Sequence, residues 1–290
     1  MPKERFHVFL ASQLLGGANP GLRLDIPAFF VGAVSPDIFY YDLPFFYLSS
    51  ISDRLHSLIE REGTGPIVDW LQGKPLEEGN SEAISWGLGL ANHFMADALW
   101  HPLIEELSSE QPPSVMYKGA ERLSTIERHR LLESEIEAFW FAKIPGANKK
   151  NYLPPDFSAN RARLTLIFSH YRSFLDFVGR LGPKRSSTGP APMAPPSEER
   201  ITRCHLSQNF LLRLFASRVA GSQRNRLLHF PPTRSLGVLV TPRRPILPEP
   251  FSKVMPEERN PFSDFFMNRA LDSMKAEWDM LLQRMSIKLP

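Results

Sequence analysis

The chain has 290 residues, of which 42% are hydrophobic and 22% are charged, and its formal net charge is +3. This length and composition suffice for one large globular domain or for one domain with an appendage. They exclude a membrane-spanning helix, because no stretch reaches the roughly 20 uninterrupted apolar residues that a span requires. The first ten residues lack the apolar core and cleavage site of a secretory signal, so we expect a cytoplasmic protein.

Cysteine usage limits the kinds of metal site that the chain can build. Its one cysteine, Cys204, excludes an internal disulfide framework and any thiolate cluster around zinc. A metal site must therefore consist of His, Asp and Glu side chains, and these suit zinc through nitrogen and oxygen ligands.

Charge is divided unevenly along the chain. Residues 183–290 carry 17 Lys and Arg against 9 Asp and Glu, whereas residues 1–182 carry 17 against 22. The acidic half also contains the His and carboxylate clusters, as expected for a cation-binding module. The basic half could meet lipid headgroups, nucleic acid or the acidic half of the same chain, and we favour the last.

Apolar residues recur with helical periodicity through most of the chain, and the alternation typical of strands is nearly absent. The pattern predicts an all-α fold. A turn at residues 35–37 and an aromatic segment through Tyr47 follow the second helix. In chain order, the expected helices span about residues 3–15, 25–34, 50 onward, 64–71, 80–107, 121–142, 160–181, 198–219 and 264–285.

The C-terminal part has a different composition. Residues 184–196 are rich in Pro, Ser and Gly, and residues 183–262 hold 13 of the 27 prolines, so much of this stretch cannot be regular helix. Residues 236–240 form the one plausible strand. We therefore predict a helical, zinc-binding domain of catalytic type over residues 1–182, a flexible linker over 183–197, and a basic, Pro-rich, partly irregular extension over 198–290.

His93, Asp97 and His101 stand four residues apart in an apolar stretch, so on a helix they form one stripe. A buried Asp costs several kcal/mol unless a partner carries positive charge. No Lys or Arg occurs between Gly79 and Tyr117. A metal ion is therefore a candidate partner. A core helix in which His and Asp satisfy each other by hydrogen bonds is the alternative, and this segment alone favours neither.

His129 and Glu133 repeat the four-residue spacing, which presents two ligands to one side of a helix. Alone, such a pair is more typical of an ordinary surface contact. Three further residues extend the series: His7 in the first expected helix, Asp37 after the Pro36 turn, and His56 on the third helix. The hypothesis of a metal site rests on this series as a whole.

The series resembles the zinc-dependent phospholipase C family over about residues 1–140, with an extension towards residue 180. The matching marks are an initial helix with a His, a Gly-Ala-Val-Ser-Pro-Asp turn, a lone helical His, a His-x-x-x-Asp pair followed by His-Pro, and a His-x-x-x-Glu pair. In chain order the ligand-type residues are His7, Asp37, His56, His93, Asp97, His101, His129 and Glu133.

The resemblance implies an all-α, multihelical bundle with a cleft for two or three zinc ions. It implies one zinc bound by Asp37, His56, His93 and Asp97. It implies a second zinc bound by His101, His129 and Glu133, and a third bound by Asp97 and His7. Secreted members complete the third site with an N-terminal Trp, where this chain has Met1 and Pro2.

The function that follows is hydrolysis of phosphoric esters by metal-activated water, with a phospholipid or another phosphodiester as substrate. Asp37 is the candidate general base, and a role as a metal ligand alone is at least as well supported. Two alternatives stay open. One is a single-strand nuclease-like phosphodiesterase, so a nucleic acid substrate is not excluded; the other is a metal-stabilised helical scaffold without turnover.

Several other residues are expected to lie outside the metal site. The aromatic run 38–47 could contact a membrane surface or an acyl chain, although core packing is the favoured interpretation. Glu135 and Glu137 are expected on solvated faces. Asp42 and Asp53 are candidates for orienting His ligands, with surface solvation equally supported. The remaining histidines, with no acid at ligand spacing, are expected to be structural or exposed: His170, His205 and His229.

Overall fold

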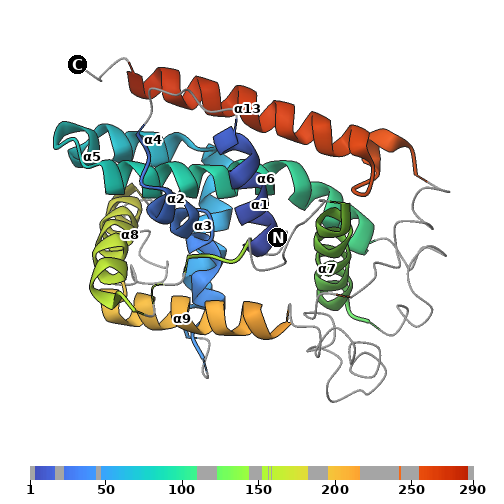
Figure 1. Ribbon diagram of the computed structural model, residues 1–290, viewed down its shortest axis with the longest axis horizontal. Helices are drawn as coiled ribbons and strands as arrows, with labels where there is room; N and C mark the ends of the chain where they lie inside the picture. Colours follow the sequence, from blue (N-terminus) through green and yellow to red (C-terminus); the bar gives the residue numbers. More distant parts are fainter. Residues whose placement is uncertain are drawn as a thin grey trace, which may run out of the picture. The chain divides into compact units, whose positions relative to one another are not determined.

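The computed structural model describes residues 4–16, 23–43, 47–109, 123–143, 152–155, 157, 159–181, 195–215, 242 and 255–286. Within these ranges the structure is built from helices and contains no strand, which confirms the prediction of an all-α fold (Figure 1). None of the helices in this part of the chain combines the length and the apolar character of a membrane span.

The described helices follow the sequence periodicity closely. They are α1 (Glu4–Gly16), α2 (Ile26–Gly32), η1 (Ser35–Tyr41), α3 (Ser49–Glu62), α4 (Gly65–Gln72), α5 (Lys74–Glu77), α6 (Ser81–Ser109), α7 (Thr125–Lys143), α8 (Arg161–Leu181), α9 (Glu198–Phe215), η4 (Glu257–Arg259) and α13 (Asp264–Ser286). The expected turn after Ser35 is a 3₁₀ helix, and the short α5 was not expected. The expected strand at 236–240 and most of the expected linker lie outside the described residues.

The chain divides into two compact units, each assembled from separate stretches of sequence. Unit 1 comprises residues 1–16, 95–153 and 210–276; unit 2 comprises residues 17–94, 154–209 and 277–290. The helices α6, α9 and α13 each contribute residues to both. The division into residues 1–182, 183–197 and 198–290 stays a prediction.

In unit 2, helices α2 and α6 touch backbone to backbone at two glycines. A Cβ atom on Gly32 would lie 2.0 Å from the carbonyl oxygen of Trp86, and one on Gly89 would lie 1.9 Å from that of Phe29. Only a residue without a side chain permits this approach. The crossing places His93, one turn beyond Gly89, beside the backbone that follows Gly32.

The start of α2 is fixed by polar contacts as well as by packing. Asp25 caps the helix by accepting a hydrogen bond from the Ala28 amide at 3.1 Å, and Pro27 occupies the first turn. The guanidinium of Arg163 on α8 donates to both carboxylate oxygens of Asp25, at 2.6 and 2.8 Å. At the other end of α2, the indole of Trp86 donates to the Ser35 hydroxyl at 3.0 Å. These contacts fix where η1 begins.

In unit 1, a buried ion pair joins α1 to α7. Arg5 Nη1 lies 3.0 Å from Glu137 Oε1, and both side chains are almost fully buried. The Arg5 guanidinium also lies 4.7 Å from the ring centroid of Phe141. Glu137 is therefore not on a solvated face, and Glu135 is buried as well. The expectation for both was wrong. For Glu137 the reason is that Arg5 of α1 supplies a cation, a contact that local sequence does not reveal.

Replacing Gly89 with Ala should lower the free energy of unfolding by about 3 kcal/mol or more, because the new methyl group would overlap the Phe29 carbonyl. Gly179→Ala on α8 is the matched control. A Cβ there meets nothing within 4 Å, so this change should be neutral or stabilising by up to about 1 kcal/mol. Urea unfolding followed by circular dichroism measures both. Equal stability of Gly89→Ala and wild type would contradict the close crossing.

Candidate metal centre

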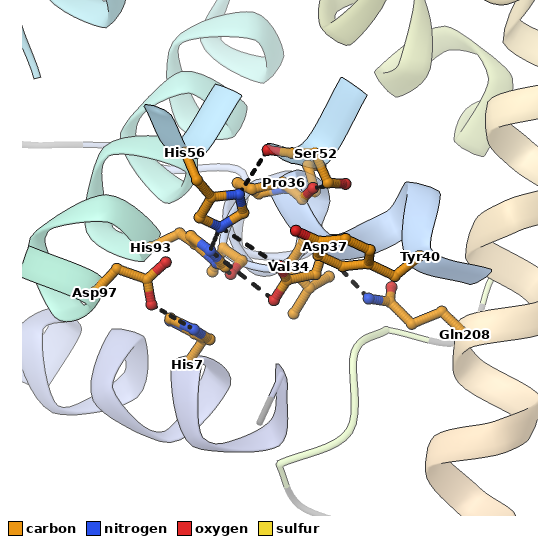
Figure 2. Close-up of polar contacts among 12 residues, drawn as sticks. His7, Val34, Pro36, Asp37, Tyr40, Ser52, His56, His93, Asp97 and Gln208 are labelled. Atoms are coloured by element: carbon orange, nitrogen blue, oxygen red, sulfur yellow. Dashed lines mark hydrogen bonds and ion pairs between the residues drawn. The ribbon is translucent and has the colours of Figure 1, made fainter. Parts of the chain in front are cut away.

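Three ligand-type side chains of unit 2 come together from three different elements. Asp37 lies in the first turn of η1, His56 on α3 and His93 on α6. His56 Nε2 is 3.3 Å from His93 Nε2 and 3.5 Å from Asp37 Oδ1, and His93 Nε2 is 3.9 Å from Asp37 Oδ2. Figure 2 shows these side chains turned toward one another. All three are buried.

Backbone contacts determine which nitrogen of each imidazole carries the hydrogen in the neutral ring. His56 Nδ1 lies 2.7 Å from the Ser52 carbonyl oxygen, and His93 Nδ1 lies 2.9 Å from that of Ala33. A carbonyl only accepts, so each Nδ1 carries the hydrogen that it donates, and each neutral ring keeps its lone pair on Nε2. Two such lone pairs and a carboxylate then face the same point. A cation at that point would satisfy all three.

The spacing of these atoms suits zinc. With bonds of about 2.0–2.2 Å to nitrogen and oxygen, neighbouring ligand atoms on a tetrahedral zinc stand about 3.3–3.6 Å apart. His56 Nε2 stands at this separation from both His93 Nε2 and Asp37 Oδ1, whereas His93 Nε2 lies 3.9 Å from the other carboxylate oxygen of Asp37. Donation of Nδ1 to a carbonyl is also the usual way in which proteins orient a histidine ligand.

The η1 turn that carries Asp37 is held by α3. The hydroxyl of Ser52 donates to the Pro36 carbonyl at 2.5 Å, and the hydroxyl of Tyr40 donates to Asp53 at 2.8 Å. The Tyr40 ring stacks on His56, with the centroids 6.4 Å apart. Asp53 thus acts on His56 through the Tyr40 ring, which it orients.

A second cluster lies within unit 1. His129 Nε2 is 3.1 Å from Glu133 Oε1, one turn along α7, and the ring centroids of His129 and His101 are 5.2 Å apart. His101 Nδ1 lies 3.6 Å from the exposed carboxylate of Glu105. The three residues that the family resemblance groups around one zinc are therefore neighbours. Glu133 is buried, unlike the acid of an ordinary surface pair.

Protonation in this second cluster favours cation binding. Burial opposes the ionisation of Glu133, but nearby positive charge, including Arg130, and the hydrogen bond to His129 hold its pKa below the usual range. Burial, reinforced by nearby positive charge, lowers the pKa of His101 to about 4. At neutral pH the carboxylate is therefore charged and the imidazole is neutral, as metal ligands must be.

His7 and Asp97 form a third contact, also inside unit 1. His7 Nε2 on α1 lies 3.4 Å from Asp97 Oδ1 on α6, and both residues are buried (Figure 2). Asp97 follows His93 by one helical turn on α6. Each of the eight candidate ligands thus has another of the set close by within its own unit.

The comparison with protein families gives a match. The model of the zinc-dependent phospholipase C family matches residues 6–176, which is more than half of the chain. The chain belongs to the zinc-dependent phospholipase C family. No curated protein and no solved structure matches it. Residues 177–290, including all of α9, lie outside the family match.

Two further residues contact the turn that carries Asp37 but were not singled out as site residues from sequence. Arg200 donates to Asp42 at 2.8 Å, and Gln208 donates to the Val34 carbonyl at 3.5 Å, both from α9. From the sequence, these two residues could be placed only on an expected basic, amphipathic helix. Nothing in it indicates which element α9 covers.

Cys204, also on α9, is buried, and its Sγ lies 3.8 Å from Asp42 Oδ1. Burial, followed by the charge of Asp42, raises the pKa of this thiol to about 12. We expect the folded protein to react with a disulfide reagent at pH 8 more than about 100-fold slower than the protein unfolded in guanidinium, because the thiolate is the nucleophile. Since Cys204 is the only cysteine, the absorbance of the released thiol reports on it alone. Equal rates would show that this part of α9 is accessible.

Proposed function

We propose that this member of the zinc-dependent phospholipase C family hydrolyses a phosphodiester, most directly a phospholipid, by means of metal-activated water. Family membership supports the reaction class. The observation that carries the proposal is the convergence of Asp37, His56 and His93. The Nε2 lone pairs of the two neutral imidazoles and the Asp37 carboxylate lie together, and a cation between them would satisfy all three.

The proposed ligand sets follow the neighbours within each unit. Asp37, His56 and His93 would hold one zinc, to which the family resemblance adds Asp97. A second set consists of His101, His129 and Glu133. His7 with Asp97 is the remaining set, so the proposed number of zinc ions is two or three.

When bound, zinc would lower the pKa of a coordinated water to near 7 and neutralise charge on the phosphodiester. The protein supplies orientation and proton transfer. The carbonyls of Ala33 and Ser52 fix the two imidazoles, and burial excludes bulk water from them. The Asp37 carboxylate is the proposed acceptor of the proton that the attacking water loses. A role for Asp37 as a ligand alone leads to the same hydrolysis.

Peripheral membrane contact is the proposed route to a lipid substrate. The aromatic run divides in two: Ile38 and Phe39 are buried, as the core-packing interpretation expected, whereas Leu43 is 37% and Tyr47 is 69% exposed. Residues 44–46 lie outside the described part of the chain. An exposed apolar end beside the Asp37 turn suits contact with the lipid interface or an acyl chain. A cytoplasmic location stays a prediction of the sequence.

Metal analysis of the purified protein, paired with a phosphodiesterase assay, tests the proposal. We expect two or three zinc ions per chain and hydrolysis of a p-nitrophenyl phosphodiester that a chelator abolishes and added zinc restores. Phosphatidylcholine vesicles and single-stranded DNA, assayed in parallel, separate the phospholipase from the nuclease alternative. Zinc without turnover of any of these substrates would favour the scaffold, and absence of zinc would overturn the proposal.

Ligand variants test the two clusters separately. His93→Asn and Glu133→Gln should each weaken the binding of one zinc by at least about 100-fold, because each removes a ligand from a different set. His170→Asn is the control, since His170 pairs with Glu82 at 3.3 Å and belongs to neither set. Zinc stoichiometry after dialysis against a weak chelator measures the effect. Full zinc content in both ligand variants would show that the assignment is wrong.

A further inference from the structure

The helix α9 contacts both ends of the turn that carries Asp37. Val34 is the residue that caps the N-terminus of η1, and Asp42 caps its C-terminus. Gln208 Nε2 donates to the Val34 carbonyl at 3.5 Å, and Arg200 Nη2 donates to Asp42 Oδ2 at 2.8 Å. All of these residues belong to unit 2.

The lengths of the two elements match. Arg200 and Gln208 are eight residues apart, which is about 12 Å along an α-helix. Val34 and Asp42 are also eight residues apart, about 16 Å at the rise of a 3₁₀ helix. The long Arg200 side chain spans the difference. The two elements run antiparallel, so one face of α9 reaches both caps of η1 at once.

Burial makes these contacts consequential for the turn. Asp42 is almost fully buried, and the side chain of Gln208 is completely buried. A buried carboxylate without its cation is strongly disfavoured. Arg203, the other cation recorded near Asp42, is 4.0 Å away and largely exposed. Removal of the Arg200 guanidinium would therefore drive the end of η1 to rearrange, and Asp37 lies in the same short helix.

We propose that Arg200 and Gln208 are positioning residues of the metal centre, which clamp both ends of η1 so that Asp37 faces His56 and His93. The inference rests on the zinc centre of the proposed function. It extends the working site to α9, a helix beyond the family match at residues 6–176. Neither side chain belongs to a proposed ligand set.

The test measures metal binding directly. The variants are Arg200→Gln and Gln208→Met, with Arg200→Lys as the conservative replacement that keeps a cation beside Asp42. Arg172→Gln is the matched control, because Arg172 pairs with Glu198 of α9 at 3.0 Å rather than with a cap of η1. Zinc affinity is measured by competition with a chromophoric chelator. Visible absorption of the Co²⁺-substituted protein reports the ligand geometry, and circular dichroism checks folding.

Arg200→Gln and Gln208→Met should each weaken the binding of one zinc ion by about 10- to 100-fold and change the Co²⁺ spectrum. Arg200→Lys should recover most of the affinity, and Arg172→Gln should behave as wild type. If Arg200→Gln fails to fold, Gln208→Met is the decisive variant. Met is similar in size to Gln and lacks only the amide group that donates to Val34.

Two results would overturn the inference. One is wild-type affinity and an unchanged Co²⁺ spectrum in the folded Gln208→Met and Arg200→Gln proteins. The other is an equal loss in Arg172→Gln, which would mean that α9 acts only by its general docking. A wild-type protein that binds no zinc would instead overturn the proposed function, and this inference with it.

Discussion

The contact between the backbones of α2 and α6 at Gly32 and Gly89 is the constraint on which the unit 2 site depends. Because the two helices touch without side chains between them, the Ala33 carbonyl comes within hydrogen-bond reach of His93. That hydrogen bond fixes the tautomer of His93 and aims its other nitrogen at Asp37. A space the size of a methyl group therefore decides whether this imidazole can act as a ligand.

Electrostatics explains why so many polar groups are tolerated inside the protein. In each unit a buried acid is matched to a nearby partner: Glu137 to Arg5, Asp42 to Arg200, Glu133 to His129. Such pairs are costly to break because one charge would stay buried without its partner. The candidate metal ligands would follow the same rule under the proposed function, with a bound cation as the source of the positive charge.

The sequence predicted the helical class, most helix positions and which residues four apart share one side of a helix, because helical periodicity and four-residue spacing are local properties. His129 with Glu133 illustrates this, since one turn of α7 suffices to bring them together. It did not predict the partners Arg5–Glu137 or Arg200–Asp42, whose members lie far apart in the chain and meet only through tertiary packing. The short α5 was missed because four residues carry no periodicity. The assignment of the eight candidate ligands stays a prediction.

Part of the surplus positive charge of the C-terminal half pairs with acids of the N-terminal half. Arg200 and Arg259 pair with Asp42 and Glu106 of the acidic half, as favoured from composition. A homologous chain that had lost α9 would retain an acid at position 42 with nothing to neutralise it. We would therefore expect an uncharged residue at position 42 in chains that lack α9, and an acid there in chains that have it.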